Sequence, residues 1–181
     1  MKKLLSLVLA LALCLCAVSA LADTFGLGIV TSINSSKDAE IVDGDPYDGN
    51  AQVDSTICAV ILDDDGVIVD IKYDVAQTKI PFSPEGLITA DKGAEIKSKL
   101  ELGEEYGMRG ASPIGAELFE QIASFEEYCI GKSADEIISM PTYAPNENHP
   151  RVSDVADLKS SVTIDVGAML DALQKAVNNA E

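Results

Sequence analysis

Apolar positions alternate with polar or glycine positions in the first half of the chain, with the period of two that is typical of strands. Residues 25–33 follow this pattern, and so do residues 67–73. Residues 53–62 form a β-branched run that is apolar on both sides, and residues 63–66 read Asp-Asp-Asp-Gly. The pattern predicts a first strand, followed by an antiparallel hairpin whose first arm is a central strand covered by helices.

Helical spacing dominates the second half. Apolar residues recur every three or four positions over residues 92–102 and 166–178, and each range predicts a helix. Ser112 followed by Pro113 predicts the start of another helix, with Ser as N-cap and Pro at the first helical position. Residues 133–136, Ser-Ala-Asp-Glu, match a capping box that opens a short helix.

The remaining segments are less regular. Residues 34–50 and 140–155 are rich in turn-forming residues and are predicted to be surface loops, while residues 78–82 predict a short strand. The order of elements predicts an α+β fold: an antiparallel sheet with a central hairpin, packed by three to four helices.

The first 22 residues have the features of an export signal. Lys2 and Lys3 precede an apolar run over residues 4–18, and Ala20-Leu21-Ala22 is a small-x-small cleavage pattern. We expect cleavage after Ala22, a secreted or extracytoplasmic protein with a single domain over residues 23–181, and no transmembrane segment after cleavage. An anchored or uncleaved form stays open, although leucine precedes both cysteines of the leader.

The chain is strongly acidic. Its formal net charge of −17 becomes −19 when Lys2 and Lys3 leave with the leader. Such a surface repels nucleic acid, whose binding depends on Lys and Arg, and disfavours anionic membranes. The charge serves solubility, and a metal ion, a cationic ligand or a basic protein remain open as partners.

Cys58 and Cys129 follow the leader, and both lie in apolar surroundings. They fit either one disulfide or two buried thiols, and the sequence leaves both open. The chain has no C-x-x-C pair and no Cys/His cluster, so nothing in it suggests a zinc or thioredoxin-like site.

Residues 106–112, Tyr-Gly-Met-Arg-Gly-Ala-Ser, form a candidate anion site. Arg109 and Ser112 stand beside the predicted helix start, where free amides and a guanidinium suit a phosphate or carboxylate. The alternative is a capped turn in which Arg109 pairs with one of three nearby acids, Glu101, Glu104 or Glu105.

Two further features carry weaker signals. Asp43, Asp45 and Asp48 are weak candidates for calcium ligands, but their spacing does not match an EF-hand and a solvated turn is favoured. His149 is the single histidine and lies in an irregular loop, where an exposed histidine without a role is the favoured interpretation. Since no hydrolase motif is present, the sequence predicts no hydrolytic activity.

The segment before the last predicted helix reads Asp157-Leu-Lys-Ser160-Ser161-Val-Thr163. It resembles the exported FMN-binding domain family, in which an Asp, two variable residues, then Ser or Thr, Gly, Ala and Thr precede a helix. Asp157, Ser160 and Thr163 match that pattern, while Ser161 and Val162 stand in place of the glycine and alanine. The hairpin with its Asp65-Gly66 turn is similar to the strand pair of the family.

The resemblance implies an extracytoplasmic module that holds FMN and passes electrons, linked in some members through a phosphoester to the threonine. The amides that open the last helix, with the hydroxyls of Ser160, Ser161 and Thr163, are then expected to hold the phosphate of a flavin or other phosphorylated small molecule. Arg109 and Ser112 would share that ligand if both segments face one cleft. Two alternatives stay open: Thr163 or Asp165 merely caps the helix, or the chain is an exported interaction domain that has lost the cofactor and binds a protein partner through its acidic surface.

Overall fold

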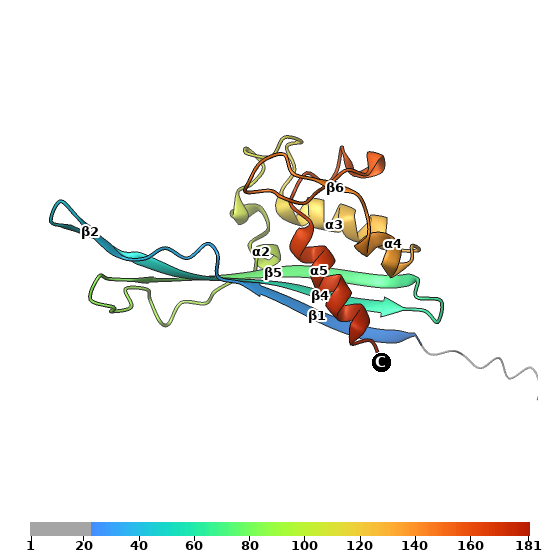
Figure 1. Ribbon diagram of the computed structural model, residues 1–181, viewed down its shortest axis with the longest axis horizontal. Helices are drawn as coiled ribbons and strands as arrows, with labels where there is room; N and C mark the ends of the chain where they lie inside the picture. The colour runs from blue at the N-terminus through green and yellow to red at the C-terminus, as the bar shows by residue number, and fades with distance from the viewer. Residues whose placement is uncertain (1–22) are drawn as a thin grey trace, which may run out of the picture.

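The computed structural model describes residues 23–181, so the predicted leader and its cleavage site lie outside the described residues. A three-stranded antiparallel sheet runs along the molecule in the order β1-β4-β5 (Figure 1). Its strands are β1 (Thr24–Ser32), β4 (Gly49–Leu62) and β5 (Ile68–Phe82). The prediction of an α+β fold with an antiparallel sheet is confirmed.

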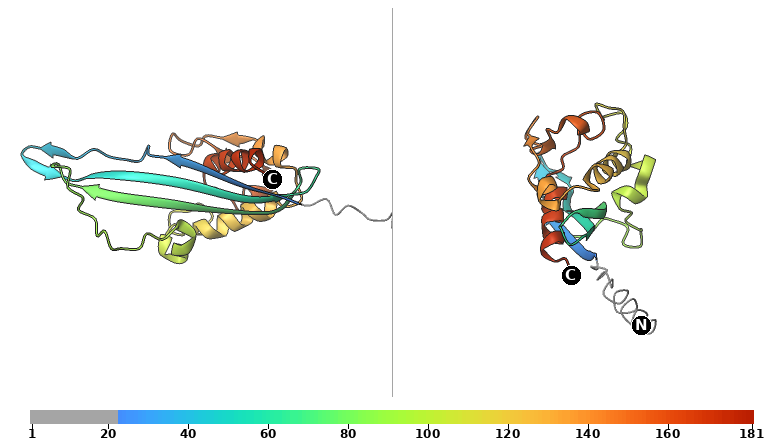
Figure 2. Two further views of the ribbon diagram at one scale, coloured as in Figure 1. Left: turned by 90° about the horizontal axis from the view of Figure 1, so that it is seen from below. Right: turned by 90° about the vertical axis from the view of Figure 1, so that its right-hand side faces the viewer.

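The predicted hairpin is confirmed and is longer than expected. β4 and β5 pair along their whole lengths, so residues 78–82, expected as a separate strand, are the end of β5. At the hairpin turn, the Asp63 carboxylate accepts hydrogen bonds from the amides of Asp65 and Val67. The other end of the hairpin extends beyond the helices as an arm (Figures 1 and 2).

The arm also carries a small hairpin, where the sequence predicted only a loop. β2 (Glu40–Val42) pairs with β3 (Asp45–Tyr47), and Asp43 and Gly44 form the turn between them, both with positive φ. Because all residues of these two strands are exposed, the packing signal that usually marks a strand in a sequence is absent here.

Helices and short segments follow the sheet along the chain, and the irregular stretch 140–155 contains one further strand pair. These elements are α2 (Lys99–Leu102), the 3-10 turn η1 (Gly103–Tyr106), α3 (Leu118–Cys129), α4 (Ala134–Ile138), β6 (Thr142–Tyr143), β7 (Val152–Ser153), the 3-10 turn η2 (Ala156–Leu158) and α5 (Gly167–Asn178). The predicted final helix and the short helix capped by Ser133 are confirmed.

Two predicted helices begin later than expected. The range 92–102 is helical only in α2, where Ser98 and Glu101 form the capping box and Gly103 ends the helix with φ 52°. α3 starts at Leu118 rather than at Ser112, because Glu117 and Glu120 cap each other's backbone there. The Ser112 hydroxyl instead accepts a hydrogen bond from the amide of Ala116, in a turn that Gly115 completes with φ 64°.

The long helices cover one face of the sheet. α5 packs on β1 and β4, and α3 packs on β5 (Figure 2). The core between them is built from buried side chains of all these elements, including Val60, Ile71, Tyr73, Ile122, Phe125, Leu170 and Leu173. None of the described helices is long and apolar enough to cross a membrane.

β1 makes its closest approach to α5 at two glycines. A Cβ at Gly28 would lie 1.9 Å from the carbonyl oxygen of Ala172, and one at Gly26 would lie 2.2 Å from that of Ala176. The helix therefore touches the strand backbone. Val30 packs against the core, while the other apolar side chains of β1 face the other way and form an outer stripe with their cross-strand partners on β4, namely Phe25, Leu27, Ile29, Ile57, Ala59 and Ile61.

The two cysteines within residues 23–181 are free thiols buried in the core. Cys58 lies opposite Tyr73 in the hairpin, and Cys129 ends α3. Burial raises the pKa of each thiol to about 12. Of the two alternatives left open by the sequence, the structure therefore has the buried thiols.

Candidate ligand cavity

A cavity of about 450 Å³ opens beside the N-terminal half of α3. Its walls come from the loop before α3, from the β6–β7 loop and from the segment before α5. The residues that line it are Met108, Ala111, Ser112, Pro113, Gln121, Tyr143, Pro145, Asn146, His149, Thr163 and Ile164. The two segments that the sequence singled out, 106–112 and 157–163, thus meet in one cavity.

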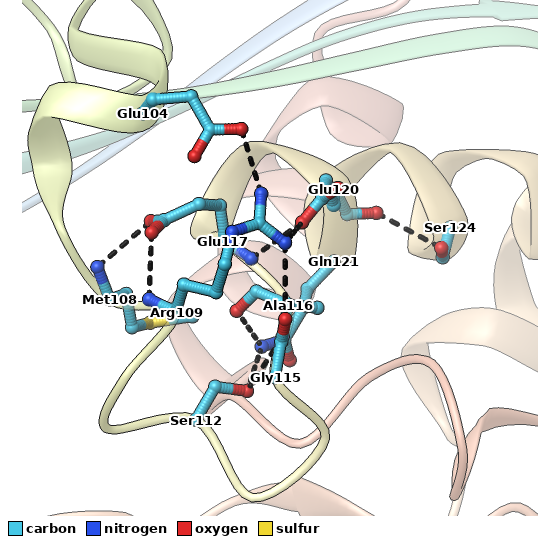
Figure 3. A network of polar contacts seen from close by, with 10 residues as sticks. All are labelled: Glu104, Met108, Arg109, Ser112, Gly115, Ala116, Glu117, Glu120, Gln121 and Ser124. Carbon is cyan, nitrogen blue, oxygen red and sulfur yellow. Dashed lines mark hydrogen bonds and ion pairs between the residues drawn. The ribbon is translucent and has the colours of Figure 1, made fainter.

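Gln121 joins these two segments. Its side-chain amide is fully buried and lies between Ser112 and Thr163. Gln121 Nε2 donates to Ser112 Oγ at 3.1 Å and to the carbonyl oxygen of Ala116 at 3.3 Å (Figure 3). Gln121 Oε1 accepts from the Thr163 amide at 2.8 Å and from Thr163 Oγ1 at 3.2 Å.

The loop before α3 is held by a second buried side chain, Glu117. One carboxylate oxygen accepts from the Met108 amide at 2.8 Å and the other from the Arg109 amide at 2.7 Å (Figure 3). Sequence reasoning missed both Gln121 and Glu117 as site residues. The signal for Gln121 was present, because it is a polar residue on the apolar face of a helix, and such a residue needs buried partners.

Arg109 does not line the cavity. Its guanidinium pairs with Glu104 at 2.7 Å and Glu120 at 3.0 Å, and it also donates to the carbonyl oxygen of Gly115 (Figure 3). These carboxylates, Glu104 first, raise the pKa of Arg109. The capped-turn alternative therefore describes this residue, and Arg109 is not free to bind a shared ligand in this arrangement.

The C-terminal motif contributes Thr163 to the cavity. Asp157 and Ser160 are exposed and lie outside the lining. Ser161 is half-buried, with its hydroxyl 3.5 Å from the carbonyl oxygen of Leu158, and Val162 is buried in the core. The larger side chains at 161 and 162 therefore do not fill the cavity.

The start of α5, where the phosphate cradle was expected, already holds a carboxylate. Thr163 lies four residues before the helix, and Asp165 Oδ1 accepts from the Gly167 amide at 2.8 Å. The Val166 amide donates to the carbonyl oxygen of Arg151. A carboxylate thus already accepts from the first amide of the helix, which agrees with the alternative that named Asp165, and it repels a second anion.

His149 reaches the cavity from the exposed β6–β7 loop. Its Nδ1 lies 3.0 Å from Asn146 Oδ1, which also accepts from the Asn148 amide. Since that oxygen carries no hydrogen, Nδ1 of His149 holds the proton. His149 is exposed, as the sequence interpretation expected, and it also lines the cavity.

The three aspartates that were weak candidates for calcium ligands do not surround a common point. Asp43 and Asp45 lie at the β2–β3 turn, and Asp48 accepts a hydrogen bond from Thr89 at 2.9 Å. Within residues 23–181, no group of three or more His, Cys, Asp or Glu side chains is placed to hold a metal ion.

Comparisons with known proteins give one partial similarity. The chain is 32% identical over 93 residues to a protein named chlorophenol reductase from Desulfitobacterium hafniense. The match covers 45% of this chain and 28% of that protein, so this chain corresponds to a minor part of its length. No family model matches the chain, and no solved structure matches it.

Proposed function

We propose that this protein is an extracytoplasmic flavin-binding module that holds FMN in the cavity and takes part in electron transfer. One observation carries the proposal: the segment that resembles the FMN-binding family and the loop before α3 line the same cavity, joined by Gln121. A bound flavin would accept and release electrons there, and the protein would hold its ring and exclude water.

The walls of the cavity suit the ring of a flavin. Met108, Pro113, Tyr143, Pro145 and Ile164 provide apolar and aromatic surface for a flat heterocycle. The volume of about 450 Å³ lies within the range of small-molecule sites. A ring bound between these side chains would be largely removed from water, which stabilises binding in proportion to the apolar area buried.

The phosphate of FMN fits less well. No Lys or Arg lines the cavity, Arg109 is paired elsewhere, and the start of α5 is capped by Asp165. Thr163 Oγ1 remains the atom through which a phosphoester would form, as the family resemblance implies. The ring thus has stronger support from the geometry than the phosphate.

The relative adds modest support. Its name, chlorophenol reductase, describes a redox activity, and we propose that this chain shares a redox role without sharing that substrate. The match covers less than a third of the relative, so the module would work with further components that supply or accept the electrons.

The proposal is tested by producing the full chain together with a flavin transferase in an exporting host. We expect a yellow protein with a flavin absorption spectrum, either in the purified chain or after addition of FMN. Intact mass then distinguishes a phosphoester, which Thr163→Val would abolish and Ser160→Ala would retain. A colourless chain whose melting temperature does not respond to FMN or riboflavin contradicts the proposal.

A second candidate function is favoured by the outer stripe. Phe25, Leu27 and Ile29 are 46–55% exposed on the uncovered sheet face, which is unusual for a face in contact with water. An exported interaction domain would use such a face as a contact surface. If the chain binds no flavin but self-associates, and Leu27→Thr with Ile29→Thr restores a monomer in sedimentation, this candidate replaces the first.

A further inference from the structure

We infer that Ser112 and Thr163 recognise the imide edge of a planar heterocycle, the neighbouring C=O and N–H groups of its pyrimidine ring, and not a phosphate. This inference rests on the proposed function, because it assigns which part of a flavin lies against the Gln121 network. It follows from the donor and acceptor roles that the network imposes on the two hydroxyls.

The orientation of the Gln121 amide is fixed by two backbone groups. The atom that faces the Thr163 amide must be oxygen, because a backbone N–H can only donate. The atom that faces the carbonyl oxygen of Ala116 must be nitrogen, because a carbonyl can only accept. Both conditions agree, so the amide cannot be flipped without losing both bonds.

Each hydroxyl takes its role from the amide atom behind it. Ser112 Oγ accepts from Gln121 Nε2 and from the Ala116 amide, so its lone pairs are engaged and its hydrogen is free to donate. No acceptor for that hydrogen occurs among the described residues. Thr163 Oγ1 donates its hydrogen to Gln121 Oε1, so it keeps only lone pairs and can only accept.

The cavity therefore presents one donor, Ser112, beside one acceptor, Thr163, at a single amide. The ligand that complements them carries an acceptor and a donor side by side, as a carbonyl and an N–H of an imide do. Hydrogen bonds from the ligand would extend the hydrogen-bond network of the buried Gln121 side chain. Bonds in such a network strengthen one another, which favours this ligand over water.

The charge of the cavity agrees with a neutral edge. None of the lining residues is Asp, Glu, Lys or Arg, and only Tyr143 and His149 have titratable side chains. A phosphate against Ser112 and Thr163 would bury its negative charge without a fixed cation, and it would also meet the acceptor oxygen of Thr163. A neutral imide carries neither cost.

The inference is tested by fluorescence titration of the full chain with riboflavin, FMN and N3-methylriboflavin. We expect riboflavin and FMN to bind within about three-fold of each other, because the phosphate contributes little. N3-methylriboflavin should bind about ten-fold more weakly than riboflavin, because it has lost the N–H donor and carries a methyl group in its place.

Variants identify the two hydroxyls. Thr163→Val should weaken riboflavin binding about five-fold, the effect of one neutral hydrogen bond, without further weakening N3-methylriboflavin, because both changes remove the same bond. Ser112→Ala should weaken both ligands. Thr163→Ser keeps the hydroxyl and should retain affinity, and Ser124→Ala, a matched change on α3 outside the cavity, should have no effect. Melting curves verify that each variant is folded.

Four outcomes overturn the inference. Equal binding of riboflavin and its N3-methyl form, or at least ten-fold tighter binding of FMN with competition by inorganic phosphate, overturns it while the proposed function stands. A phosphoester at Thr163 in the mass experiment does the same. Failure of all three flavins to bind overturns both the inference and the proposed function.

Discussion

Gln121 is the residue on which both walls of the cavity depend, so its removal has a predictable cost. Gln121→Leu leaves the Thr163 amide and the carbonyl oxygen of Ala116 without their partner in a buried position. We expect the free energy of unfolding to fall by about 2–3 kcal/mol, measured by urea denaturation. Gln174→Leu on the exposed face of α5 is the matched control. A loss below about 0.5 kcal/mol at Gln121 would mean that the two segments are held by other contacts.

The buried thiols make stability depend on alkaline pH. The pKa of Cys58 and of Cys129 rises from 9.0 to about 12 in the folded chain. Their contribution is therefore complete below pH 9 and is lost as pH rises from 9 toward 12, because the unfolded thiols ionise first. We expect each thiol to lower the free energy of unfolding by about 1.4 kcal/mol between pH 8 and pH 10.

Urea denaturation at both pH values measures this effect, and the difference between the intact chain and Cys58→Ala isolates one thiol from the other groups that titrate there. If Cys58→Ala loses as much free energy of unfolding between pH 8 and pH 10 as the intact chain does, the burial of Cys58 is contradicted. The sequence left a disulfide open because spacing does not report the distance between two side chains that are 71 positions apart.

At the scale of elements, side chains from the helices cover both edges of the sheet. On β1, the carbonyl oxygens of Leu27 and Ile29 accept from Asn179 and Lys175. On β5, the Tyr73 amide donates to Glu126 at 2.8 Å, and Glu126 also pairs with Lys72 at 2.6 Å. The backbone groups that are engaged in this way are not available for pairing with a further strand.

Because β1 and α5 are in close contact, the addition of one methyl group between them should lower the free energy of unfolding strongly. Gly28→Ala would place a Cβ 1.9 Å from the carbonyl oxygen of Ala172, which is backbone and cannot rotate away. The helix must move from the strand, and we expect a loss of about 3 kcal/mol or more in the free energy of unfolding. Thermal and urea denaturation measure it. Gly110→Ala meets no atom within 4 Å and serves as the control; equal stability of the two variants would contradict the close packing.

Elements with a buried face could be predicted from the sequence. The start of a helix could not be predicted where two possible N-caps compete for it. The hairpin and α5 follow from periodicity, because burial of one face selects those positions. The start of α3 was misplaced because Ser112-Pro113 carries a good local signal, while Glu117 and Glu120 provide a reciprocal cap five residues later. The Ser112 hydroxyl instead accepts a hydrogen bond from the Gln121 side chain, a contact that the local sequence does not reveal.

At the scale of the molecule, the sequence identified the segments that line the cavity, but it did not identify the contacts that their residues make. The sequence singled out Ser112 and Thr163, yet the interpretation relied on helix amides and on Arg109. Asp165 already engages the Gly167 amide at the start of α5, and Glu104 and Glu120 already pair with Arg109. Both arginines of the described residues pair with carboxylates in this acidic chain, so a free arginine was a weak expectation.

Variants of the outer stripe test whether its residues serve folding or form the contact surface of the second candidate function. Leu27 and Ile29 are 46–47% exposed and support no helix, so Leu27→Thr with Ile29→Thr should change the free energy of unfolding by less than about 1 kcal/mol. The same double change should reduce the binding of an apolar dye such as bis-ANS, because the exposed apolar area shrinks. Leu170→Thr, a change of the same kind in the core, should unfold much of the chain.

If the outer double variant is destabilised as strongly as the core variant, the stripe is part of the folding core and not a contact surface. A stable double variant with unchanged flavin affinity would instead mean that the stripe and the cavity are two independent faces of the protein.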